Sequence, residues 1–257
     1  MNPLMRIDPR GVILPVGLIV LAETAARLTN LQSDALAPPS DILLSGIKAL
    51  TDGSMLYATW QTLANAFSGL AIGFTLGMGL GILMGLFHPL NRLLEVTVEV
   101  LRPIPSVALL PVALLVYGFG HRMEFSIVAF ATLWPALILT RSAIAGIEPR
   151  LLEVSRALQL SLSARIFKIV IPAALPRIFV ALRLAVGISL IVAVTVEVTT
   201  NPMGLGYKMM EASQGLQPGL ALAYLVWVGM LGWAVNGIMV LAQKHLFGAA
   251  ANVEARL

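Results

Sequence analysis

The sequence predicts an all-α membrane protein, a polytopic bundle of about six transmembrane helices. Of its 257 residues, 58% are hydrophobic and only 12% are charged, and the mean hydropathy is +0.88. Soluble domains carry about 25% charged residues, so this composition is typical of a chain dissolved in lipid. The second observation is length, because several runs approach the roughly 20 apolar residues that a helix needs to cross the hydrocarbon core.

Six apolar runs are the predicted spans, at residues 11–26, 63–87, 104–119, 125–144, 178–199 and 220–242. The first is the weakest, because Arg10 and Glu23 bound a short apolar run. Such a run after Arg6 and Arg10 would also fit a signal peptide. No clear small-x-small cleavage site follows it, so we expect a membrane helix. We expect residues 28–59 and 201–219 to be loops with short helices, the first opened by Pro38-Pro39-Ser40-Asp41.

Glycine recurs at every fourth position in the second predicted span. The members of this glycine ridge are Gly69, Gly73, Gly77, Gly81 and Gly85. Residues four apart share one face of a helix, and small side chains there let another backbone approach closely. The ridge therefore predicts close helix packing, either a permanent contact or a surface that slides as the protein changes state.

Between the fourth and fifth predicted spans lies a charged segment, residues 153–176. It contains Arg156, Arg165 and Lys168 but only one acid, Glu153. Pro149 suits the first turn of a helix. Ser161 and Ser163 indicate a break between two short helices, since serine caps the free N–H groups of a helix start. A compact helix–turn–helix outside the bilayer is typical of a loop held by another protein.

The distribution of cations predicts the orientation. With the N-terminus inside, only Arg27, Lys48, Arg122 and Lys208 lie outside, and the other thirteen of the 17 lysines and arginines lie inside. The charged segment therefore faces the cytoplasm. The sequence pI is about 9.8, but the cations are spread along loop ends, which argues against a nucleic-acid partner.

Glu197 is the ionisable side chain that falls clearly inside a predicted span. Near the outer end of a helix, it either ties the turn of residues 201–207 or contributes with Gly204 and Gly206 to a gate or pathway. Asn236 in the last span is expected to hydrogen-bond a neighbouring helix.

No catalytic or metal-binding constellation is visible in the sequence. His88, His121 and His245 lie at different span ends, and HExxH, GxSxG and phosphate-loop motifs are absent, as is cysteine. We therefore expect no enzyme, no metal and no cofactor in this chain.

The charged segment resembles the cytoplasmic signature of ATP-binding-cassette importer permeases, which reads Glu-Ala-Ala, three residues, Gly, nine residues, Ile-x-Leu-Pro. Glu153 fills the acidic position, and Ile169, Ile171 and Pro172 fill the end. Val154 and Ser155 replace the two alanines, and Gln159 replaces the glycine. Glycine at this position would ease a left-handed turn between the two short helices, and glutamine makes that turn less favourable. We therefore expect the bend nearer residues 161–163.

The resemblance extends over residues 38–247. Arg102-Pro103-Ile104-Pro105, Ala108-Leu109-Leu110-Pro111 and Tyr117-Gly118-Phe119-Gly120 are similar to the third span of the nitrate/sulfonate/taurine branch. Glu197 with Gly204-Leu205-Gly206-Tyr207 is similar to that branch's fifth-span exit.

The resemblance implies one permease domain over residues 1–257, with a coupling loop at about 147–177. It implies a bacterial inner-membrane location and a complex of two permease copies, two ATPase subunits and an extracytoplasmic solute-binding protein. ATP and Mg would bind the ATPase, and the substrate would pass between the third, fourth and fifth spans of the two copies. The implied coupling residues are Glu153, Val154, Arg156, Ala157, Leu158, Gln159 and Leu160.

The substrate stays open at this point. The branch carries small anions such as sulfonates and nitrate, while some relatives carry heterocyclic vitamin precursors. The alternative from another class is a secondary carrier or channel that needs no ATPase. Such a protein is expected to carry ionisable coupling residues near the bilayer midplane, and none is visible in the sequence.

Overall fold

The computed structural model describes residues 9–29 and 33–248, and it confirms the all-α class. No strand occurs in these ranges. The long helices are α1 (Pro9–Leu28), α3 (Ser54–Leu86), α6 (His121–Ala145), α9 (Ile171–Thr199) and α11 (Pro218–Phe247). The shorter helices are α2 (Pro39–Thr51), α4 (His88–Leu101), α5 (Leu110–Tyr117), α7 (Pro149–Ala157), α8 (Leu162–Arg165) and α10 (Gly204–Gln214).

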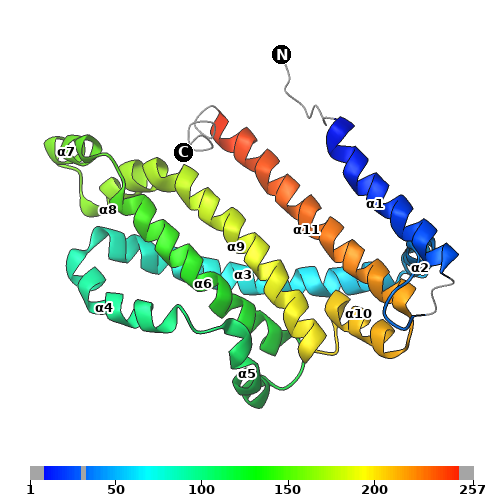
Figure 1. The fold of residues 1–257 in the computed structure, drawn as a ribbon. Helices are drawn as coiled ribbons and strands as arrows, with labels where there is room; N and C mark the ends of the chain where they lie inside the picture. Colours follow the sequence, from blue (N-terminus) through cyan, green and yellow to red (C-terminus); the bar gives the residue numbers. More distant parts are fainter. Residues whose placement is uncertain (1–8, 30–32, 249–257) are drawn as a thin grey trace.

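Helices α3, α6 and α9 form the centre of the bundle. α6 packs against α3 along much of its length and against α9 on another side, and α11 packs against both α10 and α2. In Figure 1 the hairpin of α7 and α8 lies at the upper left and the start of α1 and the end of α11 lie at the top, whereas α5 lies at the bottom and α2 and α10 lie toward the right. We call these two ends of the molecule the α7 end and the α10 end.

The described part of the chain contains four segments long and apolar enough to cross a membrane. They are Ser54–Leu86, His121–Ala145, Ser163–Gln214 and Pro218–Phe247. Many large apolar side chains on them face outward, among them Leu76, Ile191 and Trp233. In water such a surface would be an aggregation hazard, so it is explained by lipid or by a partner subunit.

The third predicted span, residues 104–119, is not a single straight helix. Helix α4 and the helical segment Ser106–Tyr117 form a pair bent by 82°, which would count as a fifth span only if both parts were taken together. The bend lies at residues 102–105, where two prolines remove backbone donors and clash with a continuing helix. Helix α4, which we had not predicted as a helix, precedes this bend.

Most other predicted spans begin or end within a few residues of the observed helices. The largest differences are at α3, which begins nine residues before position 63, and at α9, which begins at Ile171 and continues through Pro176. Prolines are tolerated in membrane helices because neighbouring groups satisfy the freed carbonyls. The short helix predicted after Pro38 is present as α2. Helix α1 forms over the weakest run, but it is not among the four segments named above.

Candidate functional site

The charged segment folds into two short helices at the α7 end. Helix α7 begins at Pro149, and its C-terminus closes with a hydrogen bond from the Leu160 N–H to the Ser155 carbonyl, 3.1 Å long. Gln159 lies between them at φ 48°. A left-handed residue spanned by such a six-residue bond is the Schellman motif, which satisfies the free carbonyls of a helix end.

Gln159 corrects our expectation about the bend. We had expected it nearer residues 161–163, because a side chain disfavours the left-handed conformation that glycine accepts. The structure instead places the left-handed turn at Gln159 itself. The capping role expected for serine is present at the start of α8, where the Ser161 hydroxyl accepts the Ala164 N–H at 3.3 Å.

Helix α7 exposes apolar side chains next to charged ones. Leu151, Val154 and Leu158 are 40%, 50% and 64% exposed, and Glu153 is exposed as well. Ala157, Gln159 and Leu160 complete the turn, with Leu160 half-buried. The Arg156 side chain lies outside the described part of the structure, although its backbone belongs to α7. An exposed apolar face on so short a helix is typical of a docking surface.

The end of the signature lies where the loop re-enters the bundle. Ile169 belongs to a π-helical turn, Ile166–Val170, that continues directly into α9, and Ile171 and Pro172 open α9. Val170 in this turn is fully buried in a cluster with Ala143, Ala174 and Ile178. The charged segment therefore continues directly into α9 and packs against the α7 end of α6.

The five glycines of the ridge all face α6. A methyl group added to Gly69, Gly73, Gly77 or Gly81 would overlap the backbone carbonyl of Phe125, Ala129, Leu133 or Leu137, in that order. At Gly85 it would overlap the side chain of Ile144. Gly79, outside the ridge, has nothing within 4 Å of the same added group. Helices α3 and α6 thus touch backbone to backbone over about four turns.

Glu197, Gly204 and Gly206 come together at the α10 end. Glu197 is 1% exposed, and its Oε2 accepts the Gly206 N–H at 2.9 Å and the Thr62 hydroxyl at 3.0 Å. Gly204 has φ 83°, and a side chain there would overlap the Glu197 carboxylate. Glu197 therefore ties the turn between α9 and α10 and joins it to α3.

A second buried acid belongs to the same cluster, and sequence reasoning missed it. Glu124 is fully buried at the start of α6, and its Oε2 accepts hydrogen bonds from Asn65 and Asn201. We had begun the fourth span at Phe125 and so counted Glu124 as part of an outer loop. The signal that could have found it is a glutamate one residue before an apolar run.

Asn236 makes the expected interhelical bond, accepting from Arg183 Nε at 3.0 Å between α11 and α9. Within residues 9–29 and 33–248, no three His, Asp or Glu side chains gather as metal ligands would.

Two cavities lie near the residues that the sequence singled out. One, of about 410 Å³, lies beside the α4–α5 bend and is lined by Arg102, Ser106, Phe130 and Trp134, with apolar side chains of α9. The indole N–H of Trp134 is buried there without a hydrogen-bond partner. The cavity thus combines a mostly apolar wall with one cationic residue, Arg102.

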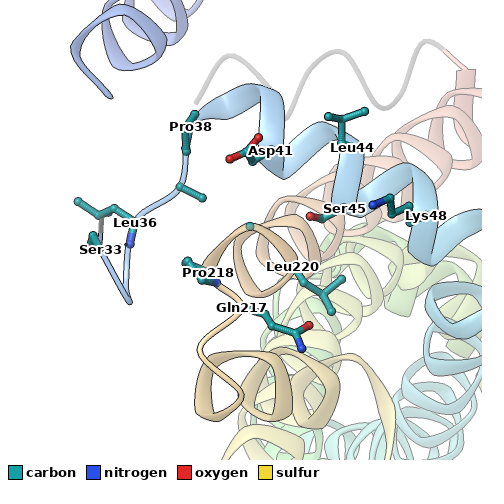
Figure 2. Close-up of a pocket in the computed structure, with 12 residues that line it drawn as sticks. Ser33, Leu36, Pro38, Asp41, Leu44, Ser45, Lys48, Gln217, Pro218 and Leu220 are labelled. Carbon is teal, nitrogen blue, oxygen red and sulfur yellow. Dashed lines mark hydrogen bonds between the residues drawn. The ribbon is translucent and has the colours of Figure 1, made fainter. Parts of the chain in front are cut away.

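The other cavity, of about 490 Å³, lies at the α10 end. Figure 2 shows Asp41, Ser45 and Lys48 along α2, with Gln217 and Leu220 from the start of α11 beside them. It is an open hollow with charged groups of both signs.

Sequence comparison matches residues 73–249 to the model of the "Binding-protein-dependent transport system inner membrane component" family. The chain belongs to this family. It is therefore the membrane-embedded permease component of an ATP-binding-cassette importer, a subunit that is not itself an enzyme.

Named relatives cover most of the permease. It is 27% identical over 237 residues to the putative aliphatic sulfonates transport permease SsuC of Bacillus subtilis, covering 92% of this chain and 86% of the relative. The Escherichia coli SsuC is 30% identical, with 89% and 86% covered. The bicarbonate transport permease CmpB of Synechococcus elongatus is 29% identical, with 73% and 69% covered.

Solved structures agree on the fold. The MetNI methionine ABC transporter in an inward-facing conformation matches with a TM-score of 0.66 at 20% identity, covering 72% of this permease and 93% of that chain. An amino acid ABC transporter crystallised with histidines matches with a TM-score of 0.64 at 18% identity, covering 78% and 98%.

Proposed function

We propose that this permease imports a small organic or inorganic anion, of the sulfonate, nitrate or bicarbonate kind. Two copies would form the pathway, an extracytoplasmic binding protein would deliver the substrate, and two ATPase subunits, which bind ATP and Mg, would drive it. The N-terminus and the α7 end would face the cytoplasm. All 257 residues would form one permease domain.

The exposed apolar face of α7 carries the proposal for the ATPase partner. Leu151, Val154 and Leu158 would enter a cleft of the ATPase, and Glu153 and Arg156 would supply polar contacts at its rim. The signature end, Ile169, Ile171 and Pro172, would transmit movement of the loop to α9, because α8, the π-helical turn and α9 follow one another without a gap.

Two observations support an anionic substrate. The relatives named above are permeases for sulfonates and bicarbonate. The cavity at the α4–α5 bend is lined by Arg102 beside an apolar wall. Such a surface suits a small anion with an apolar body, since the cationic side chain would bind the charged head.

Transport would follow from a shift between two conformations. ATP binding would draw the two coupling helices together and favour the outward-open state, and hydrolysis would restore the inward-open state. A partner can shift the equilibrium only by contacting the two states differently.

The cavity at the α10 end, with Asp41 and Lys48 on its wall, offers a polar surface for the binding protein.

Charge reversal on α7 tests the ATPase contact. Glu153→Lys should insert and fold normally, because the residue is exposed outside the spans, yet it should release the ATPase or uncouple its hydrolysis from uptake. Losing one partner of a desolvated charge pair at an interface costs about 2–5 kcal/mol. The readout is co-purification of the ATPase, followed by ATPase and uptake assays in vesicles.

The control is Glu211→Lys, which reverses an exposed charge at the α10 end. It should leave ATPase binding unchanged. Wild-type ATPase binding and coupling in Glu153→Lys would reject this residue as a transmission contact.

A further inference from the structure

Glu124 and Glu197 reach the same buried site from two helices. Glu124 stands at the start of α6 and Glu197 near the end of α9, with side chains 0% and 1% exposed. Their carboxyl groups accept hydrogen bonds from Thr62 and Asn65, which are one helical turn apart on α3, so the two groups lie next to each other. Helix α3 and the α9–α10 turn close the site with Thr62, Asn65 and Asn201.

The hydrogen bonds use one oxygen of each acid and leave the other free. Glu124 Oε2 accepts from Asn65 and Asn201, and Glu197 Oε2 accepts from Thr62 and Gly206. The Oε1 atoms of both acids are buried with no partner. A buried polar atom without a partner is rare in native proteins and needs an explanation.

The surrounding groups hold the donors in place. The carbonyl oxygen of Asn65 lies 2.6 Å from His121 Nδ1, and that of Asn201 accepts the Gly120 N–H at 2.9 Å. Thr62 accepts the Leu205 N–H at 2.9 Å and so directs its own hydrogen at Glu197. Both amides and the hydroxyl are therefore committed as donors to the Oε2 atoms.

The site contains two acids and no cation. Within the described part of the chain, neither acid forms an ion pair; Lys208 is paired with Glu211 instead, and Arg122 is exposed. His121 is the one other titratable group in the hydrogen-bonded cluster, and it reaches Glu124 only through Asn65. Two adjacent carboxylates without a counter-charge cannot both stay ionised in a buried site.

We propose that Glu124 and Glu197 bind one proton between them, shared by the two Oε1 atoms. The proton converts one free acceptor into a donor that faces the other, which satisfies both orphaned oxygens and removes one charge. It fastens α6 to α9 at the α10 end, with α3 and the α9–α10 turn attached through the Oε2 bonds. Losing it would leave two like charges that push α6 and α9 apart.

Infrared difference spectroscopy on the purified full-length permease tests the proton directly. At neutral pH the wild type should show the carbonyl band of a protonated carboxylic acid. Glu124→Gln and Glu197→Gln should each remove it, because an amide donor replaces the shared proton and the remaining carboxylate stays ionised. The absence of the band in the wild type, or its persistence in both variants, would overturn the proposal.

The pH dependence of unfolding gives a second readout. The folded state holds one proton that the unfolded carboxyls release above their ordinary pKa of about 4.3. Raising the pH therefore favours the unfolded state, and the unfolding constant should increase about tenfold per pH unit until the native pair itself titrates. Glu124→Gln should lose this slope, whereas Glu211→Gln, an exposed control, should keep it.

A bound metal ion is the competing explanation for the two free oxygens. Adding sodium or calcium chloride at constant pH and ionic strength would then stabilise the wild type, and the carboxylic acid band would be missing. That result, or an equal pH slope in Glu124→Gln and the wild type, would overturn the proposal.

Discussion

Gln159 carries backbone strain that the glycine of the family signature would avoid. A non-glycine residue in the left-handed region costs about 1–2 kcal/mol, and Gln159 has φ 48°. We predict that Gln159→Gly raises the free energy of unfolding by up to about 1 kcal/mol, since part of the gain is offset by the greater freedom of glycine in the unfolded chain. Thermal unfolding of the purified permease measures this.

The matched variant at the same position is Gln159→Val. A β-branched side chain is least tolerant of this conformation, so it should destabilise the turn. If Gln159→Val were as stable as Gln159→Gly, the left-handed turn would not exist at this residue.

Gly204 is required for two independent reasons. Its φ is 83°, and an added methyl group would overlap the Glu197 carboxylate. We predict that Gly204→Ala destabilises the permease by about 2–4 kcal/mol, combining the left-handed cost with overpacking in a closed site. Gly187→Ala is the control, because nothing lies within 4 Å of the added group in α9. Equal melting temperatures for the two variants would contradict the prediction.

At the scale of elements, the α3–α6 contact depends on which face of α3 carries glycine. Gly77→Ala should weaken it by about 1–3 kcal/mol, because the methyl group would meet the Leu133 carbonyl and the Ala136 side chain. Gly79→Ala should be neutral or stabilising by up to about 1 kcal/mol, since alanine is the better helix former and space is open there. Unfolding in detergent, with expression level as a second readout, compares the pair.

The opposite ranking, with Gly79→Ala the weaker protein, would mean that α6 packs on another face of α3. Equal stability of the two variants would mean that the ridge is loose enough to slide without a cost.

At the scale of the whole molecule, orientation can be tested with single cysteines. The native chain contains none, so any labelling comes from the introduced residue. Thr51→Cys and Ser213→Cys, both exposed at the α10 end, should react with an impermeant thiol reagent added to intact cells. Ser163→Cys, exposed in the coupling loop, should react only after permeabilisation. Reaction of Ser163→Cys in intact cells would reverse the orientation inferred from the cations.

The composition and residue pattern of the sequence were sufficient to predict features that depend only on residues close together in the chain. The long apolar helices follow from the cost of exposing backbone and charge to lipid, which any run of about 20 apolar residues avoids. The cap at Ser161, the start of α7 at Pro149 and the start of α2 after Pro38 follow from local backbone chemistry. The four-residue spacing of the glycines likewise places them on one face of α3, whichever helix packs against that face.

Features that depend on distant residues required the tertiary structure. Glu124 and Glu197 are 73 positions apart in the sequence, and only the packing of α6 against α9 makes them a pair. The 82° bend after α4 was hidden because two prolines can break, kink or merely cap a helix, and the surrounding helices decide which. The left-handed turn at Gln159 was missed for a different reason, because it is local: the hydrogen bond from the Leu160 N–H to the Ser155 carbonyl closes the end of α7 there and outweighs the preference of one side chain.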